Sequence, residues 1–166
     1  MSESSVGAWV VDPAGSSATF ASKTFWGLTT VRGTFGGLAG AGTVAGDGTV
    51  SGELVIDAAQ LSTKNKVRDQ HLRSADFFNV DKFPAVVVRI ASTTRDGDTV
   101  TGAGTIEAGG QTQPITFTGR VAESDGAVTL TAGATVDHRA LGMTWNRLGM
   151  LAGTAKGSVT ARFVRG

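Results

Sequence analysis

The chain has 166 residues and carries 15 Lys and Arg residues against 14 Asp and Glu residues, for a formal net charge of +1. This length is typical of one domain with a sizeable core, and the balanced charge, without any basic run longer than a pair, argues against nucleic-acid binding and against a polybasic membrane anchor. The sequence contains no cysteine, which excludes disulfides, thiol nucleophiles and cysteine-based zinc sites.

The start of the sequence has no recognisable targeting signal. Residues 1–8 contain no basic segment followed by an apolar one, and we expect a flexible N-terminus there, ahead of a single domain at residues 9–166. No apolar run approaches the roughly 20 residues of a membrane span. The sequence therefore predicts a cytoplasmic protein, unless a signal peptide has been removed.

Short runs of alternating apolar and polar residues recur along the chain, separated by turn residues. A period of two is typical of strands in a sheet with one sheltered face. We expect strands at residues 9–11, 17–23, 30–35, 50–56, 86–90, 100–106, 115–121, 128–136 and 159–163. Residues 36–48 are so rich in glycine that we expect a loop there.

Dipeptides of the hairpin type separate several of these runs, namely Asp47-Gly48, Asp96-Gly97, Gly109-Gly110 and Asp125-Gly126. Successive hairpins make each strand antiparallel to its neighbour in the sequence. About eight such strands close into an up-and-down barrel, which removes exposed edges. The sequence therefore predicts an all-β, eight-stranded antiparallel β-barrel, with an open two-sheet sandwich as the alternative.

Residues 62–75 break the alternation and predict a short helix. Ser62 or Thr63 is expected to cap its first turn. A spacing of four residues defines one helix face, formed by Val67, His71 and Ala75. The other side of the helix holds Asp69, Gln70 and Arg73. We expect this helix to plug or flank one end of the barrel.

Small residues occupy many inward positions of the predicted strands, namely Gly33, Gly52, Gly102, Gly104, Gly119, Ala132, Ala134 and Ala161. An eight-stranded barrel needs bulky inward side chains to fill its middle, so small ones leave space. The remaining inward residues are Val, Leu, Ile and Phe, and the space therefore suits an apolar ligand. In the alternative interpretation, the glycines permit bulges and sharp coiling while large neighbours fill the gap.

No catalytic, metal-binding or cofactor motif accompanies this pattern. The sequence lacks a nucleophile elbow, a phosphate-binding glycine loop and an HExxH pair, and its two histidines, His71 and His138, lie far apart. His71 is the more informative of the two, because an imidazole on the helix face can donate to a ligand head group. A half-buried histidine bonded to a carboxylate or carbonyl is the alternative. We therefore predict a binding protein without metal or cofactor, and not an enzyme.

Several motifs together resemble the bacterial YceI-like family. The longest reads Arg68-Asp69-x-His71-Leu72-Arg73-Ser74, followed by Asp76-Phe77-Phe78 and Phe83-Pro84. Other stretches are similar to further marks of the family: Trp9-x-x-Asp12-Pro13, Val31-x-Gly33-x-Phe35, Ile56-Asp57-Ala58 and a block at residues 136–146. The resemblance covers residues 9–164. It implies a lipocalin-like, eight-stranded barrel with a long internal tunnel that binds polyisoprenoid chains, including isoprenoid quinones.

The resemblance and the strand pattern together suggest which residues contact the ligand. His71 and Arg68 are expected to fix the head group at the tunnel mouth. The expected aromatic residues around the opening are Trp26, Phe77, Phe78 and Trp145, and the expected tunnel wall includes Phe20, Phe35, Leu54, Val88, Ile106, Phe117 and Leu130. Many family members carry a secretory signal, and its absence here favours a cytoplasmic store or carrier.

Two other classes of function stay in view. One is a small-molecule enzyme or stress-response binder that uses His71 in the cavity, and the other is a structural homodimer that pairs through an exposed barrel face. The variant His71→Ala separates the first class from a lipid carrier, since retained binding with lost turnover indicates catalysis. Light scattering across concentration tests the dimer.

Overall fold

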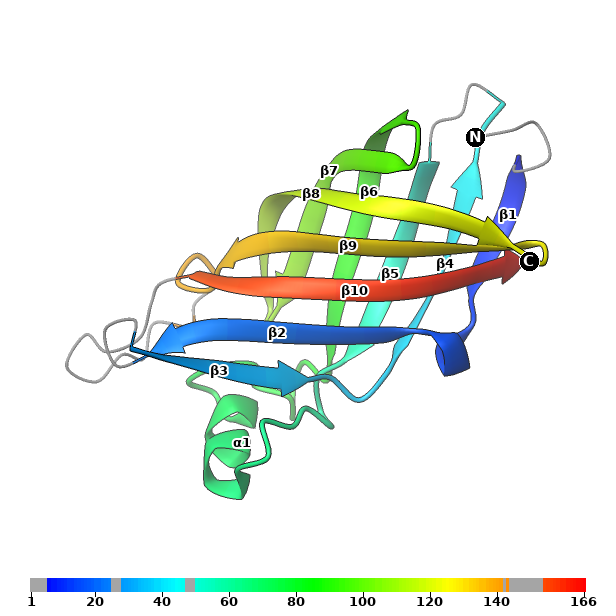
Figure 1. The fold of residues 1–166 in the computed structure, drawn as a ribbon. Coiled ribbons are helices and arrows are strands. Elements are labelled where there is room, and N and C mark those ends of the chain that lie inside the picture. Colours follow the sequence, from blue (N-terminus) through cyan, green and yellow to red (C-terminus); the bar gives the residue numbers. More distant parts are fainter. Residues whose placement is uncertain (1–5, 25–27, 47–49, 142, 144–153) are drawn as a thin grey trace.

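Ten antiparallel strands form one sheet that closes on itself (Figure 1). The computed structural model describes residues 6–24, 28–46, 50–141, 143 and 154–166. Around the barrel the strands follow the order β1 (Gly7–Val11), β4 (Leu38–Val44), β5 (Val50–Asp57), β6 (Ala85–Asp96), β7 (Thr99–Ala108), β8 (Gln111–Ser124), β9 (Ala127–Asp137), β10 (Thr154–Arg165), β2 (Ser17–Thr24) and β3 (Thr29–Thr34). A further pairing between β1 and β10 closes the barrel.

Two of the barrel's strands are broken, so the ten strands make an eight-stranded barrel. β1 and β2 pair with β10 one after the other, while β4 pairs with β1 and β3 pairs with β2. The chain from β1 to β2 is therefore one bent strand, and the chain from β3 to β4 is the next. Each strand is antiparallel to its neighbour in the sequence, which confirms the predicted eight-stranded antiparallel barrel.

A hydrogen-bonded corner bends the first of these strands. The 3-10 helix η2 (Pro13–Gly15) is capped by Asp12, whose carboxylate accepts from the backbone N–H of Ala14 at 3.2 Å. The other carboxylate oxygen of Asp12 lies 2.8 Å from Nη1 of Arg162 in β10. The Ser16 hydroxyl donates to the carbonyl of Asp12 and accepts from the backbone N–H of Arg162. The corner is thereby attached to β10, which lets one chain segment pair with β10 in two halves.

The expected loop at residues 36–48 is wrong in its middle, where β4 forms. Glycine normally weakens a strand because it packs no side chain. Here close backbone contact requires it, since a Cβ on Gly40, at φ +149°, would collide with the carbonyl of Glu53 in β5. The strand is anchored by Leu38 and Val44, which are buried at its two ends.

Three of the four predicted hairpin turns lie within the described residues, and a hairpin forms at each, although the first turn is Gly97-Asp98 and so lies one residue later than predicted. Gly97 has a φ of 62°, and both central residues of the next two turns have positive φ, with 58° and 81° at Gly109-Gly110 and 54° and 76° at Asp125-Gly126. Paired positive φ values match the right-handed twist of the strands that such turns join. Asp47-Gly48 lies outside the described residues.

The helix is shorter than predicted and faces the other way. α1 spans Lys66–Arg73, and its N-cap is Asn65, whose side chain accepts from the backbone N–H of Arg68 at 3.1 Å, instead of Ser62 or Thr63. Val67 is 79% exposed, whereas Asp69 is buried. The predicted orientation of the helix was wrong because it placed the charged Asp69 on the side facing water, where charged side chains normally lie. Asp69 is buried because its Oδ1 accepts from both the backbone N–H and the hydroxyl of Thr63.

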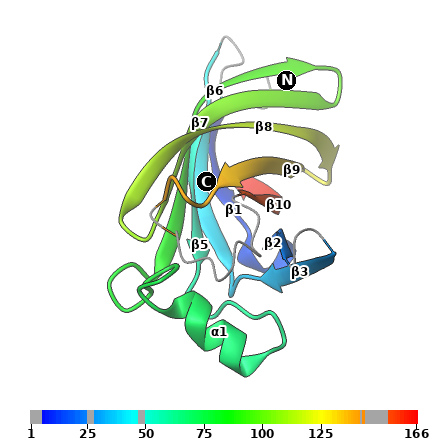
Figure 2. The ribbon, with the colours of Figure 1, turned by 90° about the vertical axis from the view of Figure 1, so that its left-hand side faces the viewer.

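Two arginines of α1 bind the segment that leads into the helix. Arg73 donates to the carbonyls of Ala59 and Leu61 at 2.8 and 2.6 Å. Arg68 donates to the hydroxyl and the carbonyl of Thr63 at 2.8 and 2.9 Å. The helix flanks the barrel, below β3 and β5 in Figures 1 and 2. Within the described ranges, no helix has the length and apolar character that a membrane span requires.

The variant Asp69→Asn should lower the free energy of unfolding by about 1–3 kcal/mol at neutral pH, because an amide cannot replace the charged acceptor. Burial opposes ionisation of Asp69, but the hydrogen bonds from Thr63 and the charges of Arg73 and Arg68 outweigh it and hold the pKa of the carboxyl below its usual range. The stability that Asp69 supplies is therefore complete above its unfolded pKa of about 3.9 and is lost as the pH falls through the native pKa.

Urea unfolding of both proteins at several pH values tests this prediction. The difference between wild type and variant should be constant near neutral pH and should shrink in acid. Asp81→Asn, at an exposed position, is the matched control and should leave stability unchanged. A difference that persists unchanged in acid would contradict the role assigned to the carboxylate.

Candidate functional site

The barrel encloses an apolar cavity of about 150 Å³. Its wall comes from β2, from β5 to β10 and from the connecting segments. Nearly all of the lining is aliphatic or aromatic, and the polar residues that line it are Thr19, His138 and Ser158. An apolar protein cavity of this size excludes water and holds a molecule about as large as benzene.

All seven residues predicted for the tunnel wall line this cavity: Phe20, Phe35, Leu54, Val88, Ile106, Phe117 and Leu130. Phe78, predicted for the opening, lines it too. The rings of Phe20, Phe35 and Phe78 form a cluster with centroids 5.1 to 6.3 Å apart. Because Phe78 follows α1, this cluster packs the helical connection onto the barrel.

The other residues predicted to bind the ligand lie elsewhere. Nε2 of His71 is 2.9 Å from Oδ2 of Asp76, and the imidazole packs edge-on against Phe77 at 5.2 Å. Arg68 binds Thr63, as described above. His71, Phe77 and Arg68 are not among the residues that line the cavity, and their roles in ligand binding stay predictions. Two further residues of the predicted opening lie outside the described residues, Trp26 and Trp145.

The open space comes from β9 and β10. Ala134 pairs with Gly157 and Ala132 pairs with Val159, and all four residues line the cavity. The other small residues act differently. A Cβ on Gly33 would meet the ring of its cross-strand partner Phe20, and a Cβ on Gly102 would meet the ring of Phe117.

The remaining glycines on the inward face allow neighbouring strands to approach. A Cβ on Gly52, Gly104 or Gly119 would meet a backbone carbonyl of the adjacent strand. Ala161 is fully buried in the core. At the glycine positions, the alternative interpretation of coiling and large neighbours is therefore the correct one, and the cavity depends on the small residues of β9 and β10.

A second cavity of about 90 Å³ lies farther along the barrel, toward its other end, and is lined by Trp9, Val44, Val121, Val128 and Phe163 among others. Ile90, Phe117 and Leu130 line both cavities. These three side chains therefore form a partition, which we call the Phe117 partition. Phe117 is only 8% exposed, and its ring lies over Gly102, where no side chain displaces it.

Charged side chains lie at this second end of the barrel, which we call the deep end. A register shift between Ile90 and Ser92 in β6 brings Thr93 and Arg95 to the lining of the second cavity. Arg95 donates to the carbonyl of Gly97 at 2.7 Å and lies 3.5 Å from Glu123. At the same end, the guanidinium of Arg165 stacks 4.3 Å from the centre of the Trp9 ring.

At the opposite end of the barrel, fewer backbone hydrogen bonds join β8 to β9. The pairing of β8 with β9 stops at Thr118 and Gly133, although both strands continue. The backbone N–H of Val121 donates to the carbonyl of Asp98, on the β7 side of β8. Successive residues of a strand point their backbone groups to alternate sides. Residue 114 is seven positions away, so its backbone nitrogen points toward β9. Proline has no N–H to donate there, and Pro114 therefore occupies a position where the ladder is absent.

A side chain replaces part of the missing ladder. In the amide orientation that satisfies both groups, the Gln113 nitrogen donates to the Asp137 carbonyl at 2.8 Å and its oxygen accepts from the Asp137 N–H at 3.2 Å. Partial desolvation opposes ionisation of the Asp137 carboxyl, but hydrogen bonds from Arg139 and Ala140 and the Arg139 charge hold its pKa below its usual range.

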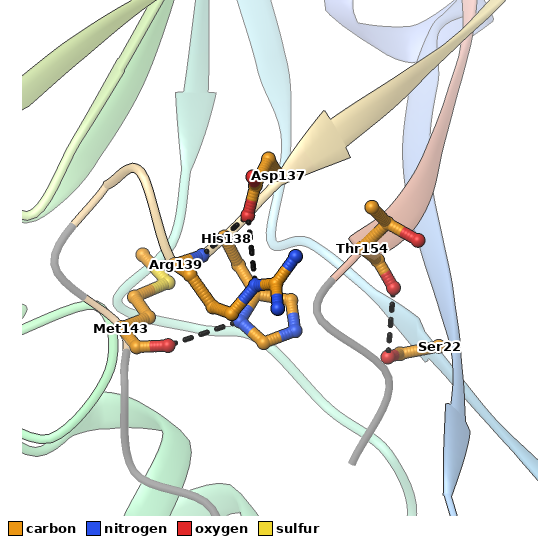
Figure 3. Close-up of polar contacts among 6 residues, drawn as sticks. All are labelled: Ser22, Asp137, His138, Arg139, Met143 and Thr154. Atoms are coloured by element: carbon orange, nitrogen blue, oxygen red, sulfur yellow. Dashed lines mark hydrogen bonds and ion pairs between the residues drawn. The ribbon is translucent and has the colours of Figure 1, made fainter.

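His138 lines the cavity at this end, as Leu141 and Met143 also do. Figure 3 shows its imidazole next to Met143. Its Nδ1 lies 3.0 Å from the carbonyl of Met143, which places a proton on Nδ1. The sequence interpretation missed this position. The alternation that runs through Ala134 and Val136 predicts an inward residue at 138 once it is carried two residues past Val136. Across the described residues, no three His, Asp or Glu side chains gather as a metal site would require.

Figure 3 also shows how β2 and β10 meet at this rim, where the Ser22 hydroxyl donates to the carbonyl of Thr154 at 3.3 Å. Asp137 and Arg139 form the neighbouring ion pair, with Nε of Arg139 3.4 Å from Oδ1 of Asp137. The rim is therefore polar, whereas the cavity behind it is apolar.

The family model of the YceI-like domain matches residues 9–163. Proteins named YceI from Shigella flexneri and Escherichia coli O157:H7 are 36% identical to this chain over 64 residues, which cover 39% of this chain and 34% of each relative. The match thus spans about a third of the length of these curated relatives.

Solved structures show the same fold at low sequence identity. BcnA of Burkholderia cenocepacia superposes with a TM-score of 0.82 at 16% identity, over 92% of this chain and 98% of that chain. A YceI protein of Campylobacter jejuni superposes with a TM-score of 0.68 at 16% identity, over 81% of this chain and 85% of that chain.

The variant Phe117→Ala should join the two cavities and lengthen the apolar chain that the barrel accepts. Removing the ring should lower the free energy of unfolding by roughly 3–5 kcal/mol. Each additional methylene that enters the second cavity should strengthen binding about fourfold. Titration calorimetry with straight-chain alcohols of increasing length measures both the affinity and the length at which it stops rising.

Phe35→Ala is the control, because it removes a ring from the first cavity and leaves the Phe117 partition in place. Affinity should stop rising at the same alcohol length in Phe35→Ala as in the wild type, and at a longer one in Phe117→Ala. An unchanged limit in Phe117→Ala would show that this ring does not divide the interior.

Proposed function

The chain belongs to the YceI-like family, and from this premise we propose that it stores or carries an apolar lipid inside its barrel, with an isoprenoid chain or an isoprenoid quinone as the ligand. The family's barrel fold suits a hydrophobic ligand. The observation that carries the proposal is the apolar cavity behind a polar rim, inside a closed barrel of strands. Such a cavity favours apolar groups over water because burial releases their hydration.

The size of the interior limits how a long ligand enters. Burial of apolar surface contributes about 25 cal/mol per Å², from which the lost freedom of the chain is subtracted. The first cavity, at about 150 Å³, holds a short apolar segment. A longer chain needs the second cavity as well, and therefore needs the side chains of the Phe117 partition to rotate. The proposal thus includes a rearrangement of Ile90, Phe117 and Leu130 on loading.

The head group in this proposal lies at the end of the barrel where β8 and β9 are not paired, which we call the open end. His138 lines the cavity there, and the Met143 carbonyl orients its imidazole. The deep end is less suitable, because Arg95 already binds Gly97 and Glu123. An amphipathic lipid therefore enters tail first, from the end at which β8 and β9 are not paired.

Organic extraction of the purified protein, followed by mass spectrometry, should yield a stoichiometric apolar lipid, and a prenyl lipid or quinone would identify it. A ligand can be lost during purification, so the measurement is repeated after incubation with an isoprenoid quinone, which should then be recovered from the protein. A clean extract under both conditions would sink the proposal.

The variant Ala134→Phe should fill the cavity and reduce the bound lipid at least about tenfold, because the added ring occupies the space that the ligand needs. Thr135→Phe is the matched control. It adds the same ring to the next residue of β9, where the side chain is exposed on the outer face. Equal lipid content in the two variants, both folded by circular dichroism, would place the ligand outside the cavity.

A further inference from the structure

A hollow of about 540 Å³ lies on the outer face of β10, β2 and β3, which run side by side in Figure 1. Ala21 of β2 is in its centre, paired with Lys156 of β10 on one side and with Arg32 of β3 on the other. The chain at residues 62–64 closes the β3 side, because Thr34 and Ser62 exchange two backbone hydrogen bonds of 2.9 and 2.8 Å. We call this hollow the basic groove.

Three cations line the basic groove without any carboxylate: Arg32, Lys64 and Lys156. The chain as a whole has a net charge of only +1, so this is a local excess. Among the described residues, four arginines outside the groove lie beside carboxylates, as Arg89 lies beside Glu53 and Glu107. In the part of the chain that the structure describes, none of the three groove cations has an ion-pair partner. Such a surface attracts anions.

The arrangement of these cations suits a phosphate group. Arg32 and Lys156 start from strands on either side of Ala21, about 10 Å apart, and their long side chains can converge above its small methyl group. Hydroxyl groups stand around the same point, from Thr19, Thr34 and Ser158. Phosphate oxygens accept from guanidinium, ammonium and hydroxyl donors alike, and arginine binds them in pairs.

The turn at residues 62–64 holds the third cation in place. Lys64 has a φ of 62°, and its backbone N–H donates to the Ser62 hydroxyl at 3.2 Å. The same segment is tied to α1, since Thr63 binds Asp69 and Arg68. The groove is thus a formed part of the fold, assembled from β2, β3, β10 and the helical connection.

We propose that the basic groove docks the protein on an anionic phospholipid surface, with lipid phosphates as the bound groups. The inference rests on the proposed function, because a lipid carrier exchanges its ligand with a membrane. The groove and the first cavity share Thr19, Phe20 and Ser158, so they lie on two sides of one wall near the open end. Docking by the groove therefore brings the open end of the barrel to the lipid surface.

Co-sedimentation with vesicles tests the docking. The wild type should bind vesicles of phosphatidylcholine with phosphatidylglycerol at low salt, and should bind phosphatidylcholine alone weakly. Each basic residue near an anionic surface strengthens association roughly fivefold, so the double variant Arg32→Gln with Lys156→Gln should bind about 25-fold more weakly. Added salt should weaken wild-type binding, because exposed charges are screened.

The double variant Lys82→Gln with Arg120→Gln is the matched control. It makes the same change in charge at two exposed positions outside the groove, and it should bind like the wild type. Equal weakening in both double variants overturns the proposal, as does wild-type binding that is indifferent to phosphatidylglycerol. Calorimetric binding of inorganic phosphate without vesicle association would assign the groove to a free anion, and also overturns docking.

Lipid extraction from the same variants separates this proposal from the proposed function. The groove variant should retain the lipid content of the wild type, because its substitutions lie outside the barrel. Vesicle binding with an empty barrel would keep the docking surface and reject the lipid carrier. A full barrel with no vesicle binding would do the reverse.

Discussion

Strand β10 holds the barrel closed, because it pairs with β9 along one side and with β2 and then β1 along the other. Closure of eight strands requires the first strand to meet the last at a tilt. Here the first strand achieves this by bending at Asp12, so that its two halves lie along different parts of β10. The Asp12–Arg162 pair is partly exposed, at 31% for Asp12 and 38% for Arg162, and such pairs add little stability. Its importance is positional, since it fixes the corner on which closure depends.

The closed barrel has an interior, and the sizes of the inward side chains determine how much of that interior is empty. Near Gly33 and Gly102, large aromatic rings lie over the glycines and pack the wall to ordinary density. Along β9 and β10, Ala134 and Gly157 face one another with nothing large between them. The cavity therefore depends on cross-strand pairing, because a small residue leaves the most space where a partner on the next strand is also small. The Phe117 partition follows from the same rule, since the ring of Phe117 rests on the glycine with which it pairs.

The same rule explains how far the sequence alone could be interpreted. The alternation of Leu130, Ala132, Ala134 and Val136 predicts which face of β9 is buried without any knowledge of its neighbours. It cannot tell whether Gly102 lies beneath an open space or beneath Phe117, because the register between strands is absent from a local pattern. The predicted exposure of Asp69 was wrong for a related reason, since its burial depends on two hydrogen bonds that Thr63 donates from a separate segment. The basic groove was equally invisible, because Lys64, Arg32 and Lys156 meet only in the folded chain.

The two ends of the barrel differ in how many backbone hydrogen bonds join β8 to β9. At the deep end, β8 and β9 pair from residue 118 to residue 124 of β8, and opening that wall breaks several backbone hydrogen bonds together. At the open end, Pro114 removes a donor and the amide of Gln113 supplies two hydrogen bonds in place of a ladder. Each such bond is worth only about 1 kcal/mol net in water, so separating these strands there costs far less than at the deep end. The end with the fewest hydrogen bonds between β8 and β9 is also the end at which His138 lines the first cavity. Under the proposed function, the barrel can stay closed and still exchange its ligand, because the missing hydrogen bonds between β8 and β9 are confined to the rim where the ligand would pass.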